Sequence, residues 1–188
     1  MKIFFDTEFT GLHKDTSLIS IGLISEDGKE FYAEVQNLER KDIDDAWLKE
    51  NVLDHTVEYG DAYVLDIVSD ENNYYTGSKE DVASFLQEWL MQFDTIELVS
   101  DVCHYDMVLF IDLFGSAFDV PENVCPACYD INQDIARAYN LSIKDAFDYS
   151  REKILEGHNI DISGEKHNSM YDARVIKTIY EILLKDNL

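Results

Sequence analysis

The sequence predicts an α/β fold in which a mixed sheet is flanked by helices. Three strand-like segments open the chain, and helix-like and strand-like segments then alternate to its end. Antiparallel strands followed by alternating helices and strands are typical of a mixed sheet covered by helices. With 188 residues, 46% of them hydrophobic, the chain can bury one sizeable core, so we expect a single domain over residues 1–188.

The first three strands are expected at residues 2–9, 17–25 and 30–36. The first two segments are apolar and rich in β-forming residues, and the third alternates apolar and polar side chains. Between the second and third, residues 26–29 carry the Asp-Gly signature of a tight hairpin. At least these two strands are therefore expected to be antiparallel.

The rest of the chain supplies helices and shorter strands. Residues 43–53 predict a short helix, and residues 60–76 are ambiguous, with a strand over residues 62–68 as one interpretation. Ser78 begins a capping sequence for a helix over residues 79–93, whose apolar side chains form one stripe. The later pattern predicts, in order, a strand, a helix, a strand and three helices over residues 95–100, 105–114, 122–128, 131–139, 143–156 and 170–186.

The strongly acidic composition limits the ligands that the surface can attract. Fifteen Lys and Arg are scattered among 39 Asp and Glu, which gives a net charge of −24. General affinity for a phosphate backbone depends on clustered Lys and Arg, so tight binding along a duplex is not expected. A nucleic acid would instead be held over a few terminal nucleotides, through bound cations.

The expected compartment is the cytoplasm. No stretch has the apolar length needed to span a bilayer, and Asp6 follows the first residues too closely for a signal peptide. The chain has three cysteines, an odd number, which argues against a disulfide framework and suits a reducing compartment.

The cysteines leave one alternative open. Cys125 and Cys128 form a CxxC pair that could supply two zinc ligands, with Cys103, His104 or His158 completing the site. No second pair stands at the spacing of a zinc finger, and a single CxxC pair beside a strand is more often ordinary buried thiol.

Asp6 and Glu8 form an acidic pair at the end of the first strand. Residues two apart on a strand point to the same face, so the two carboxylates converge. Such a pair is costly unless a cation neutralises it, and a divalent ion with oxygen ligands is its natural partner. On an exposed strand end an Asp-x-Glu pair is usually only solvated. Here it follows the apolar residues 3–5, which places it at the edge of the core.

Two further acidic residues lie near helix starts. Asp106 falls in the first turn of a predicted helix, where the helix dipole stabilises a carboxylate, so its presence there needs no metal to explain it. Asp172 precedes Ile176 by four residues, so it lies on the inward-facing edge of the last helix. His167 stands five residues before Asp172 in a polar loop, where a histidine by itself is more often a surface residue.

Taken in order, these motifs resemble the DEDDh branch of the DEDD exonuclease superfamily. Residues 6–12 (Asp-Thr-Glu-Phe-Thr-Gly-Leu) match the first motif, Tyr105 and Asp106 the second, and His167 with Asp172 the third. The short length and the opening are most similar to the compact bacterial and phage 3′-to-5′ exoribonuclease-like group. This resemblance implies a ribonuclease H-like fold with a five-stranded mixed sheet whose first three strands are antiparallel.

The resemblance also implies a set of ligands and a base. Asp6 would bind both of two Mg²⁺ or Mn²⁺ ions, Glu8 and Asp172 would complete the first site, and Asp106 would hold the second, partly through water. His167 would be the general base that takes a proton from the attacking water, and the product would be a nucleoside 5′-monophosphate.

Residues just after the first-motif Glu are implied to contact the terminal nucleotide. Phe9, Thr10, Gly11 and Leu12 are therefore candidates for stacking, ribose contact and a wedge between bases. Phe9 departs from the small hydroxyl residue of many relatives. Asp101 also departs from the family, since many relatives have Asn or His near this position. It would be either a neighbour of the metal site or simply a turn residue.

The expected function is a metal-dependent 3′-to-5′ exonuclease acting on the 3′ ends of single-stranded nucleic acid. The acidic surface favours short substrates, and the resemblance alone favours RNA over DNA. Lys166 and Arg174 could contact phosphate or be solvated helix-end charges. The alternatives are a 3′-to-5′ DNA exonuclease, a small-oligonucleotide phosphodiesterase and a non-catalytic binding protein. Relatives are often dimers, so a homodimer is a further expectation.

Overall fold

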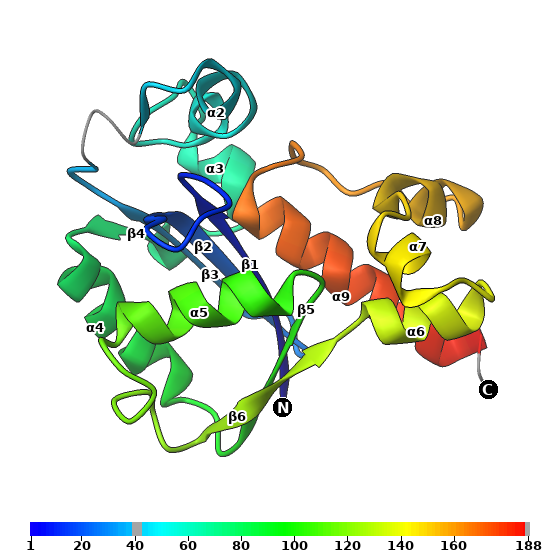
Figure 1. Cartoon of the computed structure of the whole chain (residues 1–188). Coiled ribbons are helices and arrows are strands. Elements are labelled where there is room, and N and C mark those ends of the chain that lie inside the picture. The colour runs from blue at the N-terminus through cyan, green and yellow to red at the C-terminus, as the bar shows by residue number, and fades with distance from the viewer. Residues whose placement is uncertain (39–42, 187–188) are drawn as a thin grey trace.

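A six-stranded mixed sheet with helices on both faces forms the protein in the computed structural model, which describes residues 1–38 and 43–186 (Figure 1). The strands lie in the order β4-β3-β2-β1-β5-β6. In chain order they are β1 (Lys2–Phe9), β2 (Leu18–Ser25), β3 (Glu30–Val35), β4 (Tyr74–Gly77), β5 (Ile96–Ser100) and β6 (Val124–Asp130).

Helices and short 3₁₀ turns fill the connections. They are α2 (Ala46–Asn51), η1 (Leu53–His55), α3 (Val64–Ile67), η2 (Glu71–Asn73), α4 (Lys79–Leu90), α5 (Cys103–Leu113), α6 (Asn132–Ala138), α7 (Ile143–Phe147), α8 (Arg151–Gly157) and α9 (Ser169–Asp186). None of these described helices combines the length and apolarity needed to cross a bilayer.

The antiparallel arrangement of the first three strands is confirmed. β1 pairs antiparallel with β2, and β2 antiparallel with β3. On its other side β1 pairs with β5 in parallel, and β5 with β6 in parallel. Because parallel strands end at the same edge of a sheet, the ends of β1 and β5 lie together, and the chain turns there into α5.

The expectation of five strands is wrong, since β4 adds a sixth that pairs in parallel with β3. The strand expected at residues 62–68 is also wrong, because α3 occupies most of it. Val64, Ile67 and Val68 pack into the core while Leu65 is exposed, a spacing of three and four residues that suits a helical turn.

The helix expected over residues 143–156 is divided into α7 and α8 at residues 148–150. Ser150 ends the break, because its hydroxyl accepts a hydrogen bond from the Lys153 N–H (3.2 Å) and caps α8. The other predicted elements are found with ends within three residues of those expected. The helix expected over residues 43–53 begins at Ala46, and residues 39–42 lie outside the described part of the chain.

The two faces of the sheet have separate cores. Helices α4 and α5 cover the face to which Ile3 and Phe5 point, and α9 with α6 and α8 covers the face to which Phe4 points (Figure 1). Side chains alternate along a strand, so Asp6 and Glu8 share the face of Phe4, beneath α9.

Candidate active site

The first two acidic residues lie where β1 passes beneath the start of α9. Asp6 is 8% exposed and Glu8 is partly buried. Thr7, between them, is buried and points to the opposite face, toward α5. The strand thus directs two carboxylates to one side of the sheet and a hydroxyl to the other.

That hydroxyl helps to fix the third acidic residue. Asp106, in the first turn of α5, is 1% exposed. The Thr7 hydroxyl donates to its Oδ1 (2.7 Å), and the Ser100 hydroxyl, from the end of β5, donates to its Oδ2. Sequence reasoning missed both hydroxyl residues, although Thr7 lies between the two acidic residues of the first motif. Asp106 is held at both carboxylate oxygens.

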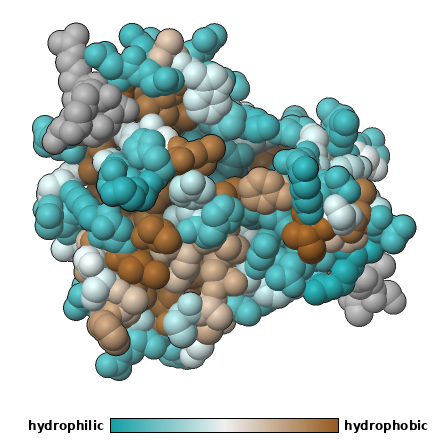
Figure 2. All heavy atoms as spheres, viewed as in Figure 1, coloured by the Kyte–Doolittle hydropathy of each residue, from teal (hydrophilic) through white to brown (hydrophobic). Residues whose placement is uncertain are grey.

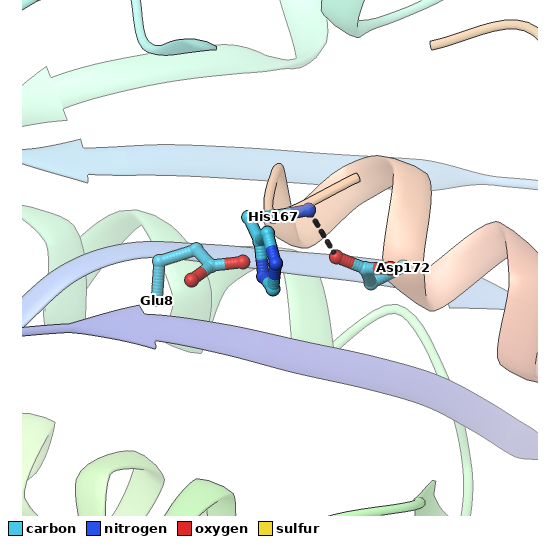
Figure 3. A group of neighbouring side chains, drawn as sticks. All are labelled: Glu8, His167 and Asp172. Carbon is cyan, nitrogen blue, oxygen red and sulfur yellow. Dashed lines mark hydrogen bonds between the residues drawn. The ribbon is translucent and has the colours of Figure 1, made fainter. Parts of the chain in front are cut away.

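The fourth acidic residue and the candidate base share a tight turn at the start of α9. Asn168 caps the helix, since its Oδ1 accepts hydrogen bonds from the Met170 and Tyr171 N–H groups (3.1 and 3.2 Å). His167 has a φ of +64°, and its N–H donates to Asp172 Oδ2 at 2.9 Å (Figure 3). The backbone that carries the imidazole is therefore tied to the carboxylate.

The end of β1 and the start of α9 meet at the candidate base. Glu8, His167 and Asp172 each offer one ligand atom, and these atoms lie within 4.8 Å of one another (Figure 3). The side chains of Asp6 and Asp106 line the same pocket, whose volume is about 560 Å³. All the predicted acidic residues and His167 are thus brought together from segments far apart in the sequence.

Gly22 permits the close approach of α9 to the sheet. It lies opposite Asp6 in the β1–β2 pair. A Cβ at this position would lie 2.4 Å from the carbonyl carbon and oxygen of Ser169, and 2.5 Å from the Met170 nitrogen. Because backbone atoms cannot move aside as a flexible side chain can, only glycine allows the first turn of α9 to sit this low over β2.

Replacement of Gly22 by Ala should lower both stability and turnover. The added methyl group would push the start of α9 away from β2, and overpacking of this kind costs about 1–3 kcal/mol of unfolding free energy. Thermal melting and turnover measurements would check this. Gly157→Ala is the control, because nothing lies within 4 Å of its Cβ position. Equal melting temperatures and activities for the two variants would contradict the role given to Gly22.

Burial raises the pKa of all four carboxyl groups. Burial raises the pKa of Asp6 and of Glu8 well above the usual range, and neighbouring carboxylates raise them further. Burial, helped by the charge of Asp101, raises the pKa of Asp106 to about 7 and that of Asp172 to about 8. Within the described residues, no Lys or Arg forms an ion pair with any of the four. The cluster thus lacks a resident positive charge.

This donor set fits hard divalent cations. It offers carboxylate oxygens at one end of the sheet, and such ligands suit Mg²⁺ and Mn²⁺ better than softer metals. His167 stands beside them, and burial lowers its pKa, with the positive charge of Lys166 contributing. A lowered pKa leaves the imidazole neutral at neutral pH, in the form that can accept a proton.

Arg151 fixes the opposite wall of the pocket. Its Nε donates to Asp101 Oδ2 (2.9 Å) and its Nη2 donates to Asn132 Oδ1 (2.6 Å). Its Nη1 donates to the carbonyls of Ala146 (3.0 Å) and Tyr149 (2.7 Å). Asp101 therefore has an ion-pair partner, and the guanidinium ties the end of α7 to the turn before α5. No signal in the local sequence pointed to this contact.

A second pocket, of about 420 Å³, adjoins the first, and both are lined by Glu8, Phe9, Leu12 and His167. All the predicted nucleotide-contacting residues, 9–12, line it. Trp47, which sequence reasoning missed, also lines it, and its ring meets the His167 ring edge to face at 5.5 Å between centroids. Trp47 belongs to α2, a helix that none of the motifs includes.

The predicted nucleotide-contacting residues differ in their surroundings. Leu12 is 76% exposed at the pocket rim, and Phe9 stacks on Tyr105 at 5.3 Å. The Thr10 hydroxyl accepts a hydrogen bond from the Ser17 N–H (3.0 Å), which shapes the loop between β1 and β2. Leu12 and Phe9 thus offer apolar contact area, whereas the Thr10 hydroxyl has a structural partner.

The cysteines form a pair that is not the predicted CxxC pair. Cys128 Sγ lies 3.2 Å from Cys103 Sγ, across β6 and the start of α5. In the part of the chain that the structure describes, the group that could hold a metal ion is the one made by Glu8, His167 and Asp172, and it contains no cysteine.

Lys166 and Arg174, which could contact phosphate or be solvated charges, lie in different places. Lys166 lines the first pocket and pairs with Glu152 at 3.2 Å. Arg174 pairs with Glu30 at 2.8 Å, and it lines other pockets, on the far side of α9's first turns. Lys166 thus remains a candidate for phosphate contact, and Arg174 is part of the packing between α9 and β3.

Solved nuclease structures share this fold. The nuclease domain of 3′hExo, a DEDDh family member bound to rAMP, is 15% identical with a TM-score of 0.64, covering 98% of this chain and 92% of that chain. Pop2p of S. pombe, in a form with Mg²⁺ and Mn²⁺ bound, is 14% identical with a TM-score of 0.58, covering 95% and 81%. Cell-death related nuclease 4 is 14% identical with a TM-score of 0.58, covering 98% and 64%. At these identities the similarity shows the fold, and the predicted resemblance to DEDDh exonucleases is confirmed.

A family comparison covers almost the whole chain. No curated protein matched the sequence. The family model described as the 3′-5′ exoribonuclease Rv2179c-like domain matches residues 1–184. With this match and the fold together, the chain belongs to the 3′-5′ exoribonuclease Rv2179c-like domain family.

Proposed function

We propose that this protein removes nucleoside 5′-monophosphates from the 3′ end of single-stranded RNA. Two divalent cations, Mg²⁺ or Mn²⁺, would be held by Asp6, Glu8, Asp106 and Asp172, with His167 as the general base. The observation that carries the proposal is the convergence of these buried carboxylates, from β1, α5 and α9, on one pocket beside an imidazole. Family membership supports RNA cleavage from the 3′ end.

The carboxylates would divide between two cation positions. Asp6 would contribute to both, Glu8 and Asp172 to the first, and Asp106 to the second. Bound cations would neutralise the cluster and stabilise the charge that develops on the scissile phosphate. The raised carboxyl pKa values support this assignment, because a bound cation would favour the ionised form of each group. Pop2p, which has the same fold, has been seen with Mg²⁺ and Mn²⁺ bound.

His167 would take the proton from the attacking water. The hydrogen bond from its backbone N–H to Asp172 holds the backbone of His167 beside the carboxylate assigned to the first cation position. Its lowered pKa keeps it neutral, which is the state a general base needs before the reaction. The edge contact with Trp47 restrains the ring from the other side.

The smaller pocket would receive the base of the terminal nucleotide. Phe9, Leu12 and Trp47 give it apolar and aromatic surface, and it shares Phe9 and Leu12, as well as Glu8 and His167, with the larger pocket. A base in the smaller pocket would therefore leave its phosphate beside the carboxylates. Stacking of this kind binds any base, which suits an exonuclease that degrades a strand without reading its sequence.

Degradation of labelled strands would test the proposal directly. Single-stranded RNA and DNA of one sequence, each labelled at the 5′ end, are incubated with Mn²⁺ or with EDTA. We expect stepwise shortening from the 3′ end, release of nucleoside 5′-monophosphates, a faster rate on RNA, and no reaction in EDTA. Internal cleavage would contradict the proposal. A faster rate on DNA would select a DNA exonuclease, and turnover of dinucleotides alone would select a small-oligonucleotide phosphodiesterase.

A further inference from the structure

Exposed apolar and aromatic side chains form a strip on two helices, α5 and α7, that meet through the rings of His104 and Phe147. On α5, His104 and Val108 are four residues apart and share an exposed face, and on α7 the same holds for Ile143 and Phe147. Val108 is 62% exposed, Ile143 56% and Phe147 45%. We call these four residues the α5–α7 strip. Figure 2 shows apolar side chains gathered over α5 within a largely hydrophilic surface.

The strip is continuous with the candidate active site. The rings of His104 and Phe147 are 6.3 Å apart, which joins the two helices, and Phe147 also lines the larger pocket. His104 lies 5.0 Å from Tyr105, and Tyr105 stacks on Phe9 at 5.3 Å with an angle of 15° between the rings. A run of aromatic rings thus leads from Phe9, which lines both pockets, through Tyr105 and His104 to Phe147 at the surface of α7.

The strip is held in place rather than carried on a free loop. The Ser142 hydroxyl caps α7 by accepting a hydrogen bond from the Asp145 N–H (3.1 Å). At the other end of α7, Arg151 binds the Ala146 carbonyl and pairs with Asp101, in the turn that leads into α5. The two helices that carry the strip are therefore fixed to each other, and its surface needs little reorganisation to bind a ligand.

Charge and size narrow the choice of ligand. The net charge of −24 gives no long-range attraction for phosphates, so a strand that leaves the pocket must be held in another way. Stacking of bases on aromatic side chains does not depend on charge. Four side chains are too few for the roughly 800 Å² per partner that a stable dimer buries.

We infer that the α5–α7 strip binds the bases of the nucleotides immediately upstream of the bond that is cut, in a single-stranded substrate. The inference rests on the proposed function and adds the path of the strand to it. The bases face Phe147 and His104, and the phosphates face the solvent. The terminal nucleotide occupies the smaller pocket, on the other side of His167.

Binding measurements with an altered protein and an altered RNA test the strip. Each protein carries Asp6→Asn, so that RNA is bound without being degraded, and its affinity for a 5′-labelled octanucleotide is measured by fluorescence anisotropy. A second octanucleotide lacks the bases at the second to fourth positions from the 3′ end. Phe147→Ala should weaken binding of the intact RNA about 5- to 150-fold and leave binding of the abasic RNA unchanged. His104→Ala should act in the same direction.

Phe118→Ala is the matched control, because Phe118 is 98% exposed and follows the opposite end of α5. It should change neither affinity. Equal weakening of both RNAs by Phe147→Ala, no weakening at all, or a change in oligomeric state would overturn the inference. Shortening of the 5′-labelled RNA from its 3′ end by the protein without any substitution reports on the proposed function. If that shortening is absent the proposed function fails, and if it is present while the strip has no effect on binding only this inference fails.

Discussion

Replacing Asp6 with Asn should lower turnover by about three orders of magnitude or more while the protein stays folded. Asp6 is the carboxylate assigned to both cations, so loss of its charge weakens both positions together. The amide has almost the same volume, and burial with three neighbouring carboxylates penalises the native charge, so the substitution removes repulsion from the metal-free fold. We therefore expect a melting temperature in EDTA at least as high as that of the wild type.

Two further variants distinguish the role of the Asp6 carboxylate from that of the general base and from the effect of losing any one charge. Asp15→Asn removes one charge from an exposed side chain and should change neither turnover nor stability. His167→Ala should lower turnover by about 100- to 10,000-fold, the range of a general base, yet keep the stabilisation by Mn²⁺. If Asp6→Asn retained turnover, or if His167→Ala were as active as the wild type, the assigned roles would be wrong whatever the fold.

The catalytic candidates could be predicted because each lies in a short local pattern. Strand alternation alone places Asp6 and Glu8 on one face, and helical spacing turns Asp172 inward. Their meeting with Asp106 depends on β1 and β5 being parallel neighbours, which no local pattern encodes. The resemblance to a known family supplied that step.

Features that rest on contacts between distant segments escaped prediction. Trp47 reaches the pocket from α2, and Arg151 reaches Asp101 across 50 positions of sequence. β4 is a four-residue edge strand that exists only beside β3, and residues 62–68 satisfy a strand pattern and a helix pattern equally until packing decides. The sequence thus predicts local geometry well, but it predicts poorly the parts of the site, such as Trp47 and the Arg151–Asp101 pair, that depend on contacts between distant segments.

The perturbed carboxyl groups also predict how stability depends on pH. The folded pKa values of Asp106 and Asp172, about 7 and about 8, exceed the ordinary value of 3.8. Between pH 4 and 8 the folded protein therefore binds more protons than the unfolded chain, and the contribution of these groups to stability falls as pH rises. We expect the metal-free protein, in EDTA, to melt at a lower temperature at pH 8 than at pH 6.

Divalent cations should reverse this loss. A cation stabilises the ionised cluster and competes with protons for it, so Mn²⁺ should stabilise the protein more at pH 8 than at pH 6. At about 100 times its dissociation constant the ion adds roughly 2.7 kcal/mol, or about 5–10 °C in melting temperature. Asp172→Asn should raise the melting temperature in EDTA at pH 8 and reduce the response to Mn²⁺, because one repelling charge and one ligand are lost together. Its amide oxygen can still accept the His167 N–H, so the turn survives. A Mn²⁺ response that is equal at both pH values, or unchanged in this variant, would mean that the cluster does not bind the ion.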